Sequence, residues 1–229
     1  GKCQYLSSNN ENDLSHRVWK KKKSIFSAPN LHFVSVSNWL AKKCKESSLL
    51  GDKHITVIPN TTNVEQYSCS RLPNSNYGIS ADKKVIVIGA ARLDDPVKGF
   101  PILLSSLKWL KAHKPETASK IHLILFGGLR DISLLQEIDI PYTFLGRIDA
   151  NRVKDVLAHA DIVISSSLYE SFGGTLIEGM AAGCTPVTFG NGGQGDIVDH
   201  KRTGYIAMYK SHEALAYGID WAINATLDR

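Results

Sequence analysis

Most of this chain alternates short apolar segments with amphipathic ones, and this alternation constrains the fold more than any other feature. From residue 83 onward, strand-length apolar runs are separated by segments whose apolar residues recur at helical spacing. Strands are expected at 85–89, 121–126, 142–145, 161–165, 185–189 and 204–208, and helices at 100–110, 132–138, 153–160, after 174 and at 213–227. Each crossover between parallel strands must lay its helix on a face of the sheet. We therefore predict an α/β fold, a Rossmann-like, doubly wound parallel sheet.

The first part of the chain follows another pattern. We expect a helix at 14–26, a strand at 31–36, a helix from 38 to about 47 that Ser37 caps, and a strand at 55–58. These elements are too few to bury a core, so residues 1–58 are predicted to be the tail of a preceding domain. Residues 59–82, rich in Asn, Ser and Thr, read as a linker-like segment before the main domain at 83–229. Gly1 opens no recognisable element, which indicates a start within a longer protein.

Positive charge is concentrated in this first part. Residues 1–58 hold ten Lys and Arg against four Asp and Glu, and the excess lies near tryptophans at 17–23 and 42–45. Such a patch is either a solvated helix face, which we favour, or a contact for anionic lipid headgroups; a nucleic acid partner is not expected. No apolar run approaches the ~18 residues of a membrane span. The cysteines lack metal-ligand spacing and are predicted to be reduced thiols: Cys3, Cys44, Cys69 and Cys184.

The segment 161–181 carries the strongest functional signal. A short apolar strand runs into a turn that holds Glu170, and two glycines then open a helix that carries Glu178. A helix that follows a strand and a glycine turn presents free backbone N–H groups at the carboxyl edge of the sheet. Such N–H groups commonly bind phosphate. Glu178 has apolar or small neighbours, so its charge needs a partner, and ribose hydroxyls would serve. Alternatively, both carboxylates are ordinary surface residues.

Three other loops are expected at the same edge. Arg92 and Lys98 follow the first strand of the sheet and suit phosphate oxygens, although they would also balance Asp94 and Asp95. Each of the next two strands ends at a glycine-bearing turn, 127–128 and 145–148. These turns either line the same cleft or simply reverse the chain.

Together these residues resemble glycosyltransferase family 4, whose members are retaining GT-B enzymes that use sugar nucleotides. Glu170 and Glu178 after the Ser-rich strand end, with Arg92 and Lys98-Gly99 upstream, carry the resemblance, which covers residues 55–225. Segment 57–60 looks like the family's domain junction. Segments 13–22 and 34–40 look like the end of its N-terminal half, in a variety similar to enzymes of capsular, exopolysaccharide or colanic-acid-type assembly.

The resemblance implies a role for each matching position. Arg92 and Lys98 would neutralise the diphosphate, and the N–H groups of Gly174, Thr175 and Leu176 would hold the distal phosphate. Glu178 would accept hydrogen bonds from the ribose hydroxyls. Glu170 would face the transferred sugar, with Phe172 and Gly173 beside it. Arg147 and Ile148 would lie against the base, with Gly128 at the same cleft. The sequence departs from the family's pattern at Ala91, Asp196 and Lys201.

The implied reaction moves a hexose-type sugar from a UDP or GDP donor to a hydroxyl of a polysaccharide or lipid-linked glycan, with retention. Neither a cofactor nor a metal is expected, since two cations and a helix end stabilise the leaving diphosphate. With most of the first domain missing, the chain would bind donor but transfer nothing alone. A cytoplasmic protein with a loose hold on the inner membrane face is expected. Two alternatives remain, a nucleotide-sugar epimerase of the same fold and a non-catalytic sugar-nucleotide-binding domain, and product analysis separates them.

Overall fold

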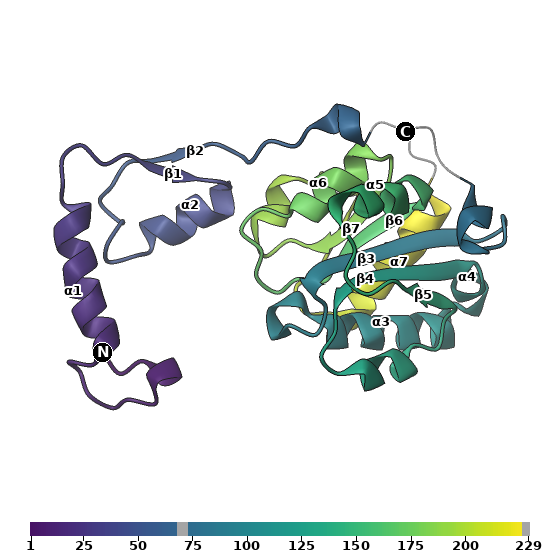
Figure 1. Ribbon diagram of the computed structural model, residues 1–229, viewed down its shortest axis with the longest axis horizontal. Helices are drawn as coiled ribbons and strands as arrows, with labels where there is room; N and C mark the ends of the chain where they lie inside the picture. Colours follow the sequence, from purple (N-terminus) through teal and green to yellow (C-terminus); the bar gives the residue numbers. More distant parts are fainter. Residues whose placement is uncertain (68–72, 226–229) are drawn as a thin grey trace. The chain divides into compact units, whose positions relative to one another are not determined.

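A computed structural model of the chain describes residues 1–67 and 73–225 (Figure 1). The chain divides into two compact units, Gly1–Pro59 and Asn60–Arg229. None of the helices in the described part of the chain is both long and apolar enough to span a bilayer.

The first unit contains two helices and two strands. They are α1 (Leu14–Phe26), β1 (Phe33–Ser35), α2 (Asn38–Lys45) and β2 (Ile55–Val57), and the two strands pair in parallel. Each helix begins where a side chain accepts a hydrogen bond from its first turn: Asp13 from the N–H of His16 at 3.1 Å, and Ser37 from the N–H of Leu40 at 3.1 Å. The predicted cap at Ser37 is thus confirmed. Neither helix has a buried residue, so this unit has little core of its own.

The second unit is built on a six-stranded parallel sheet. Its strands are β3 (Lys84–Arg92), β4 (Ile121–Gly128), β5 (Tyr142–Phe144), β6 (Ile162–Ser165), β7 (Thr185–Phe189) and β8 (Tyr205–Ala207), in the order β5-β4-β3-β6-β7-β8. The chain moves outward from β3 to β5 and then returns to the other side of β3. This reversal makes the crevice at the carboxyl ends of β3 and β6 the topological switch point, where ligands of such sheets bind.

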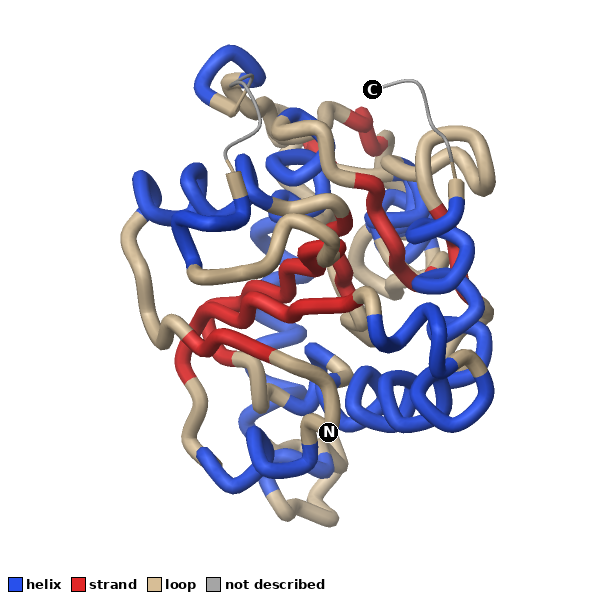
Figure 2. The backbone as a smooth tube through the Cα atoms, turned by 90° about the vertical axis from the view of Figure 1, so that its right-hand side faces the viewer, coloured by secondary structure: helices blue, strands red, loops and turns tan. Residues whose placement is uncertain are grey.

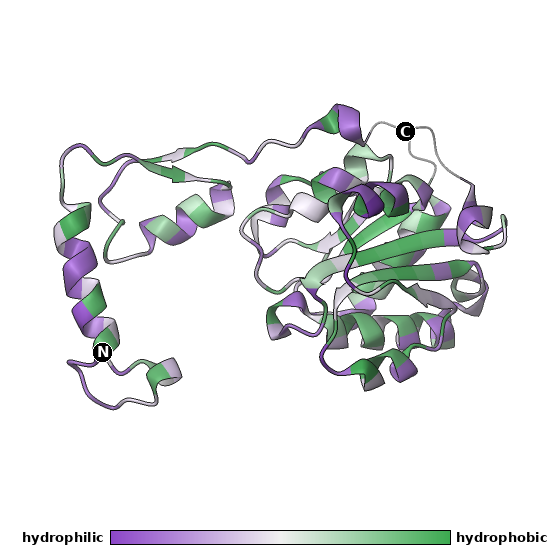
Figure 3. Cartoon of the chain, viewed as in Figure 1, coloured by the Kyte–Doolittle hydropathy of each residue, from purple (hydrophilic) through white to green (hydrophobic). Residues whose placement is uncertain are grey.

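Helices cover both faces of this sheet (Figure 2). One face carries α3 (Phe100–His113) and α7 (His212–Asn224), and the other carries α5 (Ala150–His159) and α6 (Gly174–Ala181); the short helix α4 (Pro115–Ser119) follows α3. Because both faces are covered, the central strands are apolar along most of their length, and β3 and β4 appear green almost throughout (Figure 3). The predicted Rossmann-like α/β fold is confirmed.

Several boundaries differ from the sequence prediction. β3 continues to Arg92 beyond an irregularity after Gly89, so the predicted end of this strand was too early. The helix predicted at 132–138 is a 3₁₀ helix, Ile132–Glu137. The predicted helix 213–227 ends at Asn224, and Leu227 lies outside the described residues. Two residues of the linker-like segment 59–82, Tyr67 and Ile79, are buried in the core of the second unit. Their irregular spacing gave no helix or strand pattern in the sequence.

Candidate functional site

The loop between β3 and α3 carries both predicted cations. Arg92 is the last residue of β3, and Lys98 is the last residue of a short 3₁₀ helix, Pro96–Lys98. The Asp95 side chain caps this helix by accepting a hydrogen bond from the N–H of Val97 at 3.1 Å. Gly99 then takes the left-handed conformation (φ 63°) and α3 begins at the next residue. The chain therefore turns sharply enough to leave Lys98 at the carboxyl edge of the sheet.

Arg92 is already paired with acidic neighbours. Its Nη2 lies 2.8 Å from Asp95 Oδ2, and its Nε lies 3.4 Å from Asp94 Oδ1. Asp94 Oδ2 accepts from the backbone N–H groups of Arg130 (2.8 Å) and Asp131 (3.2 Å). Burial acts to raise the pKa of Asp94, but these backbone N–H donors and the nearby guanidinium together hold it below its usual value. The alternative left open by the sequence, that Asp94 and Asp95 balance both Arg92 and Lys98, therefore holds for Arg92 and not for Lys98.

Lys98 reaches across to the loop after β6. Its Nζ lies 2.9 Å from Oε2 of Glu170, and both side chains are partly exposed. The two loops are also joined through their backbones, since Ser166 Oγ donates to the carbonyl of Lys98 at 2.8 Å and the N–H of Leu168 donates to Val97 at 2.7 Å. A predicted cation and a predicted carboxylate therefore meet at the switch point between β3 and β6.

The N-terminus of α6 opens beside Glu170. Gly173 precedes it in a left-handed conformation (φ 110°), which suits a residue without a side chain, and an added Cβ on the exposed Gly174 would meet no atom within 4 Å. The N–H groups of Gly174 and Thr175 have no acceptor among residues 1–67 and 73–225. Leu176 differs from the expectation, because its N–H already donates to Gly173 at 3.0 Å and its side chain is buried. Two of the three expected amides thus remain open to a ligand.

A glycine-rich loop after β7 supports the turn that holds Glu170. The N–H of Gly193 donates to the carbonyl of Glu170 at 2.8 Å, and Gln194 Nε2 donates to the carbonyl of Ser167 at 3.1 Å. Gln194 is fully buried, and its Oε1 has no partner within the described part of the chain. Phe172, predicted near the sugar, is itself 7% exposed and forms part of this packed turn.

The glycine turns after β4 and β5 lie at the same edge. The carbonyl of Gly128 accepts from the N–H of Leu93 at 2.8 Å, which ties this turn to the loop that carries Arg92. The Arg147 side chain runs along Gly128, where an added Cβ would lie 3.0 Å from its Nε. Ile148 packs against the core instead of standing free. Of the predicted base-side residues, Gly128 and Arg147 therefore lie together, and their contact with a base stays a prediction.

Glu178 is half-buried and has a partner that sequence reasoning missed. It lies one helical turn after Gly174 on α6, and its carboxyl forms a hydrogen bond with the hydroxyl of Tyr67. Burial raises the pKa of Glu178 above its ordinary value, while the Tyr67 hydrogen bond acts in the opposite direction. No sequence signal pointed to Tyr67, because it precedes the sheet in a segment without periodicity.

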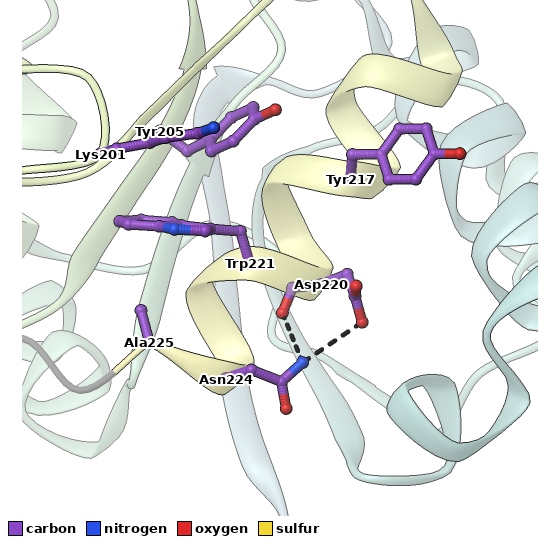
Figure 4. A pocket seen from close by; sticks show the side chains of 7 residues that line it. All are labelled: Lys201, Tyr205, Tyr217, Asp220, Trp221, Asn224 and Ala225. Atoms are coloured by element: carbon purple, nitrogen blue, oxygen red, sulfur yellow. Dashed lines mark hydrogen bonds between the residues drawn. The ribbon is translucent and has the colours of Figure 1, made fainter.

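One cavity of the second unit is lined by a candidate site residue, and another, larger cavity is not. A cavity of about 20 Å³, room for about one water molecule, lies between the ends of β3 and β6 and is lined by Gly89, Lys98 and Ser165 among others. A larger one of about 400 Å³ shares no residue with the candidate site (Figure 4). It lies between the turn before β8 and the end of α7, where the rings of Tyr205 and Trp221 are 5.7 Å apart.

Thiols and acidic clusters offer no metal site in the described ranges. Cys3, Cys44 and Cys184 are free thiols, and Cys69 lies outside the described residues. Within residues 1–67 and 73–225, His, Cys, Asp and Glu side chains form no group of three or more suited to a metal ion.

The sequence matches one protein family and several relatives. The family described as glycosyl transferases group 1 matches residues 75–229. The uncharacterized glycosyltransferase MJ1607 of Methanocaldococcus jannaschii is 30% identical over 62% of this chain and 36% of its own length. The phosphatidylinositol N-acetylglucosaminyltransferase GPI3 subunit of Saccharomyces cerevisiae is 27% identical over 90% of this chain and 46% of its own length. The chain thus spans less than half of either relative.

Solved structures share the fold. Anabaena Alr3699/HepE, in complex with UDP and glucose, superposes with a TM-score of 0.65 and 23% identity, over 84% of this chain and 53% of that one. Sucrose-phosphate synthase from Thermosynechococcus elongatus superposes with a TM-score of 0.73 and 23% identity, over 94% and 55%. The doubly wound sheet is therefore that of GT-B glycosyltransferases.

Proposed function

Because the chain belongs to the glycosyl transferases group 1 family, we propose that its protein transfers a sugar from a nucleoside diphosphate to a hydroxyl group, with this chain as the donor-binding part. The proposal includes the finer features of family 4: retention of the anomeric configuration, a hexose-type sugar, and a polysaccharide or lipid-linked glycan acceptor of the capsular or exopolysaccharide kind. It also includes a cytoplasmic location, with a loose contact of the basic helix α1 at the inner membrane face.

The contact between Lys98 and Glu170 carries this proposal. It joins the carboxyl ends of β3 and β6, the switch point at which a ligand is expected, and it lies beside the open amides of Gly174 and Thr175. A diphosphate in this crevice would meet a mobile cation from one loop and a helix N-terminus from the other. Arg92 would add forked contacts by exchanging Asp95 for phosphate oxygens.

The proposed groups stabilise the leaving diphosphate and contact the sugar during transfer. Negative charge grows on the diphosphate as the glycosidic bond breaks, and Lys98, Arg92 and the α6 amides stabilise that charge in place. Glu170, released from Lys98 by the phosphate, would face the transferred sugar with Phe172 and Gly173. No step of this scheme requires a metal or a cofactor.

The remaining contacts position the nucleoside. Glu178 would accept hydrogen bonds from the ribose hydroxyls, and Arg147, Ile148 and Gly128 would line the base. A UDP donor is the first to test, because the structural neighbour HepE is in complex with UDP and glucose, and GDP is the second.

Binding and product analysis test the proposal together. In a thermal-shift screen of UDP- and GDP-sugars, we expect at least one to raise the Tm of the 229-residue chain, which should show no transfer by itself. With acceptor, the full-length protein should yield a glycoside. An epimerised donor would instead support the isomerase, which the glycosyltransferase family match does not favour. Binding without any product would support a non-catalytic domain.

Replacing Glu178 by alanine should weaken nucleoside diphosphate binding by about 1.5–3 kcal/mol, the usual worth of hydrogen bonds to a charged group. The carboxylate is half-buried on α6, one helical turn after Gly174, and under the proposal its loss would leave the ribose hydroxyls without an acceptor. Isothermal titration calorimetry measures the change, with the exposed Glu116→Ala as control. Unchanged affinity in a folded Glu178→Ala variant would refute the ribose assignment.

A further inference from the structure

The Tyr67 side chain packs against α6, the helix that carries Glu178. It is 9% exposed and packs in the core beneath α6 with Leu176 and Val163. A short 3₁₀ helix, Val64–Gln66, delivers it, and its own N–H donates to the carbonyl of Val64 at 2.9 Å. Contacts within the protein therefore hold both the backbone and the ring of Tyr67 in place.

The only polar part of this side chain points to Glu178. A buried phenol requires a hydrogen-bond partner, and here the hydroxyl binds the Glu178 carboxyl. A carboxylate has two oxygens with about four acceptor positions, so one oxygen can accept from Tyr67 while the other accepts from a ligand. Because long side chains lose rotamer freedom on binding, a carboxylate held in place beforehand binds its ligand more tightly.

We infer that Tyr67 is a positioning residue for nucleotide binding, whose hydroxyl holds the Glu178 carboxylate in the orientation that accepts the ribose hydroxyls. The inference rests on the proposed function and adds a residue that lies before the family-matched region, which begins at residue 75. It also makes the chain that follows the first unit part of the donor site, since Tyr67 comes shortly after the boundary at Pro59.

The hydrogen bond between Tyr67 and Glu178 should affect the titration of the Glu178 carboxyl. Burial raises the pKa of Glu178, and the Tyr67 hydroxyl opposes that rise by stabilising the charged form. A charged group of α5 also lies near Tyr67: the Nζ of Lys154 is 6.0 Å from the centre of its ring. Removing the hydroxyl alone should therefore raise the Glu178 pKa further, and the loss of nucleotide affinity on acidification should begin at higher pH.

The test compares Tyr67→Phe with Tyr77→Phe. Tyr77 is a matched control, because its ring packs against the same core with Arg152 of α5 above it, and its buried hydroxyl has no partner within the described part of the chain. Two measurements are made: the Glu178 carboxyl titration by carbon-13 NMR in the ligand-free chain, and calorimetric affinity for UDP, GDP and their 2′- and 3′-deoxy forms.

We expect Tyr67→Phe to raise the Glu178 pKa, to weaken UDP or GDP binding about two- to tenfold, and to reduce the preference for the ribose form. Tyr77→Phe should leave all three unchanged. If wild-type chain binds UDP or GDP and Tyr67→Phe changes neither the titration nor the affinity, the inference is overturned and the proposed function stands. If the titration shifts but the wild-type chain binds neither nucleotide, the proposed function fails and the positioning role falls with it.

Discussion

In the full-length protein, replacing Lys98 by alanine lowers kcat by about 100- to 1000-fold, the range seen when one preorganised charge-stabilising group is removed. Donor affinity should fall much less, because the diphosphate carries more negative charge in the transition state than in the bound donor. The variant also leaves Glu170, whose side chain is 23% exposed, without the cation that lies 2.9 Å away. Steady-state kinetics and calorimetric donor binding measure the two effects separately.

Lys108→Ala is the matched control for this experiment. Lys108 forms a similar ion pair with Glu137, at 2.8 Å, on the exposed surface of α3, so its removal should leave kcat unchanged. Equal losses of kcat and donor affinity in Lys98→Ala would mean that Lys98 acts only in binding. An unchanged kcat would remove Lys98 from the catalytic set.

Replacing Gly99 by alanine should lower the free energy of unfolding by about 2–5 kcal/mol. Its left-handed backbone (φ 63°) costs a residue with a side chain about 1–2 kcal/mol, and overpacking adds about 1–3 kcal/mol. The overpacking arises because a Cβ would lie 2.2 Å from the backbone oxygen of Ser166, in the loop after β6. The two loops would separate, so donor binding should weaken as well. Urea unfolding followed by circular dichroism measures the stability.

Gly183→Ala separates backbone strain from the clash. Gly183 also has a left-handed backbone (φ 86°), but a Cβ there would meet no atom within 4 Å. This control should therefore lose only about 1–2 kcal/mol. If both variants are destabilised equally, the close approach between Gly99 and Ser166 does not contribute to stability.

The sheet and its functional edge could be predicted because they follow from local patterns and a topological rule. The apolar runs at 121–126 and 185–189 have strand length, and helices between parallel strands leave every strand pointing the same way. Loops that follow these strands must then share one edge. Arg92, Lys98 and Glu170 are predicted at one edge for this reason, and the structure joins Lys98 to Glu170 there. The sharing of one ligand by these residues and Glu178 stays a prediction.

The partners of these residues could not be predicted in the same way. The ion pair between Lys98 and Glu170 forms because two loops approach each other. That approach depends on the conformations of glycines in the loops and on the hydrogen bond from the N–H of Gly193 to the carbonyl of Glu170. The Tyr67 contact with Glu178 joins residues far apart in sequence, and the segment that carries Tyr67 has neither helical nor strand periodicity. Side-chain partners of this kind arise from tertiary packing and leave no mark in a single sequence.

The ion pairs at the carboxyl ends of β3 and β6 affect which anions could bind there. With Arg92 held by Asp94 and Asp95, and Lys98 by Glu170, an incoming anion must compete with carboxylates that are already in place. Inorganic phosphate or sulfate offers only charge for that exchange, and so gains little. The proposed sugar nucleotide would add contacts through its hydroxyls and its flat ring, so these ion pairs would favour it over simple phosphates that offer charge alone.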